Sequence, residues 1–315
     1  MTEESANLPN RRRPWVAVVF SLVMPGLGHA YCGRLPRGLV FLFVYFVPIL
    51  LLQAARAFES FGSAITGVIV LITAAPLMHL AATIDSYYVA RGTRRDYEMK
   101  DYNRWYVYVV LVLLNSASSL NATLSLRANY LEAFRVPTVS NYPTIAPGDR
   151  FLANKIAYNN SDPKRGDLVV FINPQDRAEN YIKRVVAVAG DTVEIRGGAL
   201  YINDRKVPRH PVAEFKQDGT GMGLNCEPVK GEVLCEVNGN AQYRIFLSAP
   251  PHDQESGDFE KITVPQHHCF VLGDNRNLSR DSRHFGPVPL STIKGRAEYL
   301  YWPAKGWSRF GSLTN

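Results

Sequence analysis

The stretch RVPTVSNYPTIAPGDRF, from Arg135 to Phe151, places a serine among turn-forming residues that show neither a helical nor a strand period. Ser140 lies between Pro137 and Pro143, and each proline fixes its own φ and restricts the residue before it. The backbone that carries this hydroxyl is therefore expected to be rigid, as a nucleophile requires. Taken alone, the stretch is also compatible with a surface turn of the Pro-Gly-Asp kind.

A lysine further along the chain provides the base that such a serine would need. Lys183 lies inside the apolar run Tyr181–Val188, which predicts a strand that ends at the turn signal Gly190-Asp191. Its ammonium group either reaches water or is desolvated and loses its proton near neutral pH. Because a serine hydroxyl is a poor nucleophile at its own pKa, a neutral lysine beside it would form a Ser/Lys variant of serine catalysis.

Four sequence blocks in a fixed order carry a family resemblance. They are VPTVSNYPTIAPGD, RGDLVVF (Arg165–Phe171), YIKRVVAVAGD and GDNRNLSRDSR, the last within Gly273–Pro289. Together they resemble the type I signal peptidases, the bacterial leader peptidases with a Ser/Lys dyad. The resemblance runs from about Phe134 to Trp302 and does not reach the first hundred or so residues.

The resemblance implies a membrane-bound serine endopeptidase that removes signal peptides from exported preproteins after an Ala-x-Ala-like site, without a cofactor or metal. Ser140 would be the nucleophile and Lys183 the general base. The oxyanion hole would combine the backbone N–H of Ser140 with the hydroxyl of Thr138. Supporting roles fall to Ser279, which would orient the lysine, to the ion pair of Asp281 and Arg283, and to Asp274.

The same resemblance implies two shallow apolar pockets for small substrate residues. The residues expected to line them are Phe134, Val136, Pro137, Ile145, Tyr181 and Ile182. Two positions depart from the family pattern: Asn141 follows the nucleophile where the family usually has Met, and Leu278 stands where it usually has Asn. Neither departure removes a catalytic atom, but both bear on kinetics and specificity.

Short β-rich runs separated by Gly, Pro and Asp clusters fill the second half and predict a mostly-β catalytic domain. The expected strands are Leu168–Ile172, Tyr181–Val188, Thr192–Ile195, Ala199–Ile202, Gln242–Leu247, Cys269–Leu272 and Arg296–Trp302. Residues 196–263, rich in polar turns, are expected to form an inserted second β-subdomain far from the chemistry. Cys226 and Cys235 lie in this insert and are candidates for a disulfide in an extracytoplasmic domain.

The first half of the chain is an expected α-helical membrane region. The chain has 315 residues, is 46% hydrophobic and has a net charge of +7. Many of the basic residues flank apolar segments, and no nucleic-acid motif accompanies them, so nucleic acid is not an expected partner. The apolar segments are Trp15–Tyr31, Gly38–Ala55, Gly62–Ile84 and Trp105–Leu126. The first is short and is broken at Pro25-Gly26, whereas the second is just long enough for a bilayer span and the third and fourth are long enough.

The basic loop Arg91–Arg104 is expected to lie in the cytoplasm, because positive charge favours that side. The segment that follows then runs outward, so everything after it is extracytoplasmic. We expect three spans with a re-entrant or interfacial first segment; four spans with an outside N-terminus is the alternative. This predicts a multi-pass protein of the bacterial inner membrane, with the lipid bilayer and the secretion translocon as candidate partners.

The predicted domains are therefore 1–126 in the membrane, 127–195 and 264–315 in the catalytic β domain, and 196–263 in the insert. Three other functions are compatible with part of the pattern. A self-cleaving repressor peptidase also uses Ser and Lys, but it would carry a DNA-binding domain. A dedicated pilus or conjugation-type processing peptidase is closer to the pattern, and a catalytically inactive membrane-anchored binding module is a third possibility.

Overall fold

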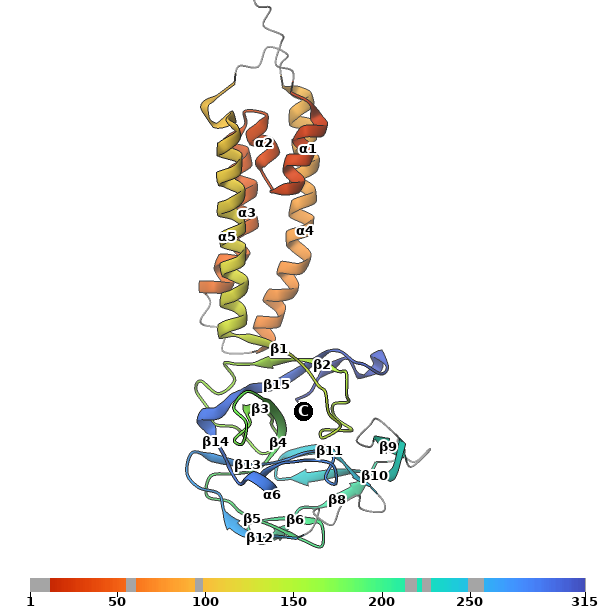
Figure 1. The fold of residues 1–315 in the computed structure, drawn as a ribbon. Coiled ribbons are helices and arrows are strands. Elements are labelled where there is room, and N and C mark those ends of the chain that lie inside the picture. Colours follow the sequence, from red (N-terminus) through yellow and green to blue (C-terminus); the bar gives the residue numbers. More distant parts are fainter. Residues whose placement is uncertain are drawn as a thin grey trace, which may run out of the picture. The chain divides into compact units, whose positions relative to one another are not determined.

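The computed structural model describes residues 12–54, 61–93, 99–212, 220–222, 228–248 and 258–314, with residues 46–54, 61–72, 122, 125, 126, 220–222, 228 and 229 described by their backbone alone. The chain divides into two compact units, Met1–Ala128 and Asn129–Asn315. The first is helical and the second is mostly β (Figure 1). The predicted order, a helical region followed by a mostly-β domain, is therefore confirmed.

The helical unit consists of four longer helices with a short helix between the first two. They are α1 (Pro14–Val23), α2 (Leu27–Tyr31), α3 (Leu35–Ala54), α4 (Phe61–Gly92) and α5 (Trp105–Asn129), with a 3-10 turn at Asp101–Asn103. The first apolar segment is interrupted between α1 and α2, as its Pro25-Gly26 pair predicts. Gly26 has φ +90°, and a Cβ there would lie 2.1 Å from the carbonyl oxygen of Gly38, so only glycine fits.

Polar contacts fix α2 against the longer helices. His29 is fully buried, and its Nε2 lies 2.7 Å from Oδ2 of Asp85 on α4. The same carboxylate accepts two hydrogen bonds from Arg37 of α3, at 2.8 and 2.6 Å. One carboxylate thus connects α2, α3 and α4, and α1 packs beside α4 (Figure 1).

Among the described residues, none of the helices combines the length and hydropathy needed to cross a bilayer. Two of the predicted spans, Gly38–Ala55 and Gly62–Ile84, fall partly on residues 46–72, which are described by backbone alone or lie outside the described ranges. The multi-pass arrangement therefore stays a prediction.

The second unit is built on an eight-stranded antiparallel sheet with the order β1-β2-β15-β3-β4-β13-β14, and β16 pairs with β15. Its strands are β1 (Leu131–Arg135), β2 (Arg150–Asn154), β3 (Leu168–Ile172), β4 (Asn180–Val188), β13 (His268–Leu272), β14 (Val288–Pro289), β15 (Ile293–Trp302) and β16 (Gly311–Ser312). The central pair β3 and β4 comes from the RGDLVVF and YIKRVVAVAGD blocks, so the middle of the sheet carries two of the four sequence blocks.

Alternation along β3 divides the core into two layers. Leu168 and Val170 pack into one hydrophobic cluster, whereas Val169 and Phe171 pack into the cluster on the opposite face. This period of two, with both faces buried, explains why the block is a continuous apolar run. The packing of β3 on both of its faces therefore fixes the position of the neighbouring strand β4.

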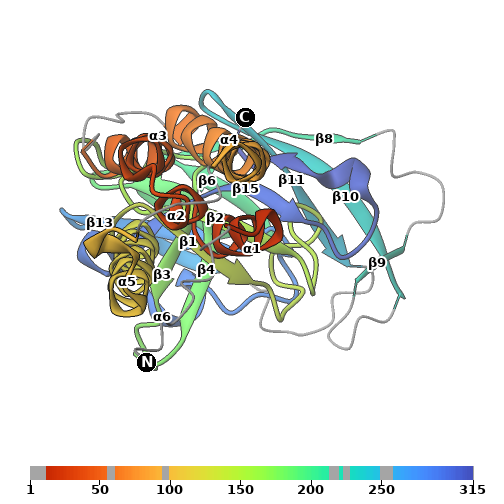
Figure 2. The same cartoon turned by 90° about the horizontal axis from the view of Figure 1, so that it is seen from above.

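Two smaller sheets complete the unit. One has the order β12-β5-β6-β7 and comprises β5 (Thr192–Arg196), β6 (Ala199–Ile202), β7 (Arg205–Lys206) and β12 (Phe259–Thr263). The other comprises β8 (Arg209–Pro211), β9 (Thr220–Met222), β10 (Pro228–Asn238) and β11 (Ala241–Ser248), with β8, β10 and β11 side by side (Figure 2). A shared core of residues from β4, β5, β6, β11 and β13 joins them to the large sheet.

All seven predicted strands are present, with ends that differ by no more than a few residues. Strands β1, β2, β10 and β12, and the shorter strands β7, β8, β9, β14 and β16, are not among those predicted from the sequence. Cys235 on β10 forms no disulfide with another residue that the structure describes. Cys226, its predicted disulfide partner, lies outside the described residues, so that pairing stays a prediction.

Candidate active site

Ser140 and Lys183 meet in a hydrogen bond. The Nζ of Lys183 lies 2.8 Å from the Oγ of Ser140, and the two side chains are 4% and 7% exposed. Ser140 lies in the turn that follows β1, and Lys183 comes from the central strand β4. The chain therefore brings together a hydroxyl and an amine that are 43 residues apart, at the distance that proton transfer requires.

The environment of Lys183 favours its neutral form. Burial disfavours the ammonium and lowers the pKa of Lys183 to about 8, against the opposing pull of the Asp281 and Asp274 carboxylates. The positive charge of Arg283 adds to the lowering. At a pKa of about 8, about a tenth of the amine is unprotonated at pH 7 and can accept the serine proton, and that fraction rises with pH.

Thr138 lies on the same turn as the serine. Its Oγ1 is 3.2 Å from the Oγ of Ser140, and its side chain is exposed toward the cleft. Within the described residues, the backbone N–H of Ser140 has no recorded acceptor. These two donors are available at one point beside the nucleophile, as the sequence predicts for an oxyanion hole.

Three of the predicted supporting residues form a compact group at the 273–283 block. The Asp281 carboxylate is fully buried and accepts hydrogen bonds from the Arg283 side chain at 2.8 Å and from the Gly273 backbone N–H at 2.9 Å. Burial alone would raise the pKa of Asp281, but the Arg283 guanidinium lowers it below its ordinary value. Ser279 lies beside Gly273, because a Cβ added to Gly273 would lie 2.1 Å from the Oγ of Ser279. Within the described residues no hydrogen bond joins Ser279 to Lys183, so its orienting role stays a prediction.

Asp274 pairs with an arginine that the sequence does not predict for the site. Arg184 follows Lys183 on β4, points to the other face and donates to both oxygens of Asp274 at 2.6 Å. The hydroxyl of Thr144 donates to the same carboxylate at 2.5 Å. The next residue, Asn275, donates its backbone N–H to the carbonyl of Ser140 at 3.1 Å. A second charge in an apolar strand was the available signal for Arg184.

The inserted segment contacts the catalytic block, which corrects the expectation that it lies far from the chemistry. Phe246 of β11 donates its N–H to the carbonyl of Asp274 at 2.8 Å and accepts from the N–H of Arg276 at 3.1 Å. Arg276 also forms a buried ion pair with Glu236 of β10. The β10–β11 hairpin therefore holds residues 274–276 in place. Within this segment, the N–H of Asn275 donates to the carbonyl of Ser140.

The two departures from the family pattern both lie in the site. Asn141 is fully buried and donates from Nδ2 to the carbonyl of Ile182 at 2.7 Å. It therefore ties the nucleophile turn to the residue before Lys183. Leu278 packs with Val139 and Ala146 in a small apolar cluster. Asn141 thus makes a hydrogen bond through its side-chain amide, and Leu278 makes apolar contacts.

A cleft of about 520 Å³ contains the dyad. Five of the six predicted substrate-binding residues line it: Phe134, Val136, Pro137, Tyr181 and Ile182. Ile145 is the exception, because it is fully buried in the core beneath Val136. The sequence did not predict the remaining lining residues, which are Arg135, Val139, Phe151, Val170, Glu179, Asn180, Leu278 and Arg280.

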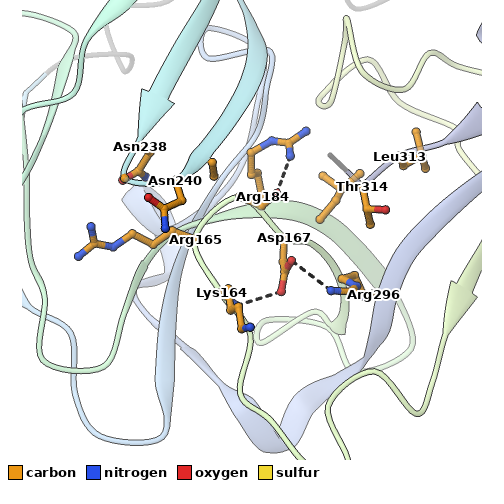
Figure 3. Close-up of a pocket in the computed structure, with 13 residues that line it drawn as sticks. Lys164, Arg165, Asp167, Arg184, Asn238, Asn240, Arg296, Leu313 and Thr314 are labelled. Carbon is orange, nitrogen blue, oxygen red and sulfur yellow. Dashed lines mark hydrogen bonds and ion pairs between the residues drawn. The ribbon is translucent and has the colours of Figure 1, made fainter. Parts of the chain in front are cut away.

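A second cavity, of about 510 Å³, is lined by a different set of residues (Figure 3). In it, Asp167 accepts from the Lys164 backbone at 2.9 Å and faces Arg296 at 3.6 Å, and Arg184 forms part of the wall. Its three arginines are each matched by a carboxylate: Arg184 with Asp274, Arg165 with Asp191 and Arg296 with Glu298. Neither Ser140 nor Lys183 is among its lining residues, so the first cleft is the candidate active site.

Comparisons with known proteins agree with this geometry. The family described as "Signal peptidase, peptidase S26" matches residues 103–302. Signal peptidase I of Aquifex aeolicus is 33% identical over 208 residues, covering 58% of this chain and 80% of the relative. Signal peptidase I of Bacillus caldolyticus is 32% identical, covering 64% of this chain and 90% of the relative. Thylakoidal processing peptidase 1 of Arabidopsis thaliana is 31% identical, covering 59% of this chain and 46% of that protein.

Among solved structures, a signal peptidase I from Enterococcus faecalis is 28% identical and covers 43% of this chain and 97% of that one, with a TM-score of 0.27. The match of the family to more than half of the chain, and the identity to relatives that are covered over most of their length, are decisive. The chain belongs to the signal peptidase family, peptidase S26.

Proposed function

We propose that this chain cuts signal peptides from exported preproteins with Ser140 as nucleophile and Lys183 as general base. The observation that carries the proposal is the 2.8 Å hydrogen bond between the Lys183 amine and the Ser140 hydroxyl at the base of a cleft. Both groups are buried, and the lysine has a pKa of about 8. An inactive binding module would have no need of this arrangement.

In the first half of the reaction, the Oγ of Ser140 attacks the carbonyl carbon of the scissile bond while Lys183 removes the hydroxyl proton. The negative charge that develops on the carbonyl oxygen is stabilised by the Ser140 N–H and the Thr138 hydroxyl. The lysine ammonium then gives its proton to the leaving amine. This breaks the peptide bond and leaves an acyl-serine.

In the second half, water attacks the acyl-serine, and Lys183 again takes and returns the proton. The Asp281–Arg283 pair and the Arg184–Asp274 pair lie behind the dyad, and the Asn275 N–H fixes the Ser140 carbonyl. We assign these residues to positioning, because none is recorded in contact with the Ser140 hydroxyl or the Lys183 amine. They hold the two reacting atoms at the distance that catalysis needs.

Small residues before the scissile bond fit the apolar part of the cleft. Phe134, Val136 and Ile182 provide shallow apolar walls, with Phe134 stacked on Phe151 at 5.6 Å between ring centroids. An extended substrate adding beside β4 would present alternate side chains to these walls. This supports an Ala-x-Ala-like preference.

We further propose that the helical unit associates with the bacterial inner membrane and that the catalytic unit lies on its outer side. Many apolar side chains of the described helices are exposed, among them Val40, Phe43, Leu77, Leu113 and Leu114. In water such exposure is unfavourable, whereas lipid tails would cover it. Lipid and the secretion translocon would then be its partners, and residues 196–263 remain the proposed insert.

The experiment that tests this function uses the full chain, purified in detergent, with a preprotein that carries an Ala-x-Ala site. We expect a single cut directly after the second Ala, identified by N-terminal sequencing of the product. Cleavage elsewhere, or none above the level of the Ser140→Ala protein, would contradict the proposal.

A further inference from the structure

The two ends of the catalytic cleft differ in charge. Its walls, residues 134–140 on one side and 179–183 on the other, both lead away from the dyad. Arg135 and Glu179, which carry opposite charges, are therefore the charged lining residues at the far end. Both side chains are exposed.

Arg280 lies at the other end, beside the dyad. A Cβ on Gly273 would come within 2.1 Å of the Ser279 Oγ and 2.5 Å of the Ser140 carbonyl oxygen, so Ser279 is adjacent to the nucleophile turn. Arg280 is the next residue in the chain and lines the same cleft. Its side chain is therefore near the point where the scissile bond would lie.

The carboxylates nearest to Arg280 in the chain are already paired, Asp281 with Arg283 and Asp274 with Arg184. The buried Glu236 accepts from both Arg276 and Arg209. Arg280 itself is exposed, and among the residues that the structure describes no carboxylate pairs with its guanidinium. An exposed arginine without a paired carboxylate thus lines the dyad end of the cleft.

We propose that Arg280 reads the charge of the first residues after the scissile bond and favours an acidic side chain there. The inference rests on the proposed function. With the small residues of an extended substrate held against Phe134 and Ile182, the residues that follow the scissile bond leave past Leu278 and Arg280. A carboxylate there gains a charge-assisted contact with the guanidinium, whereas a lysine is repelled.

The test measures kcat/KM on three peptides that are identical except for Glu, Gln or Lys directly after the scissile bond. We expect the unchanged protein to prefer Glu over Lys roughly fivefold, the size of one exposed ion pair gained and one like-charge contact avoided. Raising the salt concentration should weaken the preference, because screening acts on exposed charges. Arg280→Gln should abolish the order, and Arg280→Glu should reverse it.

Arg205→Glu is the matched control, because it makes the same change of charge at an exposed position on β7 outside the cleft. It should leave the peptide order as it is. A preference for Glu that survives in Arg280→Glu, or that reverses equally in Arg205→Glu, would overturn the inference. Failure of the unchanged protein to cut any of the three peptides would instead overturn the proposed function, so the two failures are distinguishable.

Discussion

At the scale of single residues, two opposing effects set the pKa of Lys183, the proposed general base. Burial lowers the pKa of Lys183, and the carboxylates of Asp281 and Asp274 raise it, with a result of about 8. Those carboxylates do not overcome burial because each is already matched by its own arginine, Arg283 or Arg184. The arginine pairs thus protect the neutral form of the base.

The pH dependence of the reaction follows from this balance. Lys183 must be neutral to accept a proton, so kcat/KM should rise about tenfold per pH unit below a pH of about 8 and level off above it. A profile of kcat/KM against pH, measured on a peptide without ionisable groups near the cut, checks this. A midpoint near 6.5, the ordinary pKa of histidine, would contradict the lysine mechanism.

Asn141 should tune this midpoint. Its amide is fully buried between the nucleophile turn and β4, so Asn141→Met replaces a polar group beside the dyad with an apolar one. Stronger desolvation should move the acidic limb of the profile to lower pH. An unmoved limb would show that this residue does not tune the base, and a limb moved to higher pH would contradict the desolvation argument.

The dyad could be predicted from the sequence because its residues stand in blocks with a recognisable order. Arg280 could not, because its position in the cleft depends on how the 273–283 block folds against Ser140. Ile145 was wrong as a lining residue for the same reason: an apolar residue near the nucleophile packs equally well into the core.

At the scale of elements, the β10–β11 hairpin supports the catalytic block. Its contacts with residues 274–276 join segments that are far apart in sequence, and no local sequence pattern predicts these contacts. Phe246 also packs edge-on against Tyr142 of the nucleophile turn, with ring centroids 5.5 Å apart. The strands themselves could be predicted from alternation, whereas this packing could not.

The ion pair at the base of the hairpin should matter for stability. Arg276→Met leaves the fully buried Glu236 with Arg209 as its remaining partner, so the free energy of unfolding should fall by about 3 kcal/mol. For a unit of this size that corresponds to a Tm lower by roughly 6–12 °C, measured by thermal unfolding in detergent. Arg205→Met, at an exposed position, should change Tm by no more than about 2 °C. Equal Tm values for the two variants would contradict the supporting role.

At the scale of the whole molecule, the order of a helical region and a β unit could be predicted from composition and periodicity alone. Hydropathy marks the helical half, and alternation marks the strands of the other half. The topology of the large sheet could not be predicted, because β15, near the end of the chain, inserts between β2 and β3. Local patterns do not specify such long-range pairing.

The proposed orientation in the membrane can be tested with reporter fusions. The loop that contains Tyr97 carries the basic residues of Arg91–Arg104, so it should be cytoplasmic, and Leu126 should be outside. A reporter that is active only outside should therefore be silent when fused at Tyr97 and active when fused after Leu126. An active Tyr97 fusion would place the catalytic unit on the wrong side for exported preproteins.

The most direct test of the account is the loss of turnover in two single variants, Ser140→Ala and Lys183→Ala. Both remove an atom from one hydrogen-bonded unit, so each should lower kcat by at least about 10⁴-fold, and the double variant should lose little more. Circular dichroism spectra like that of the unchanged protein would show that the fold is intact. Substantial turnover in Lys183→Ala would contradict the central claim that this lysine is the base.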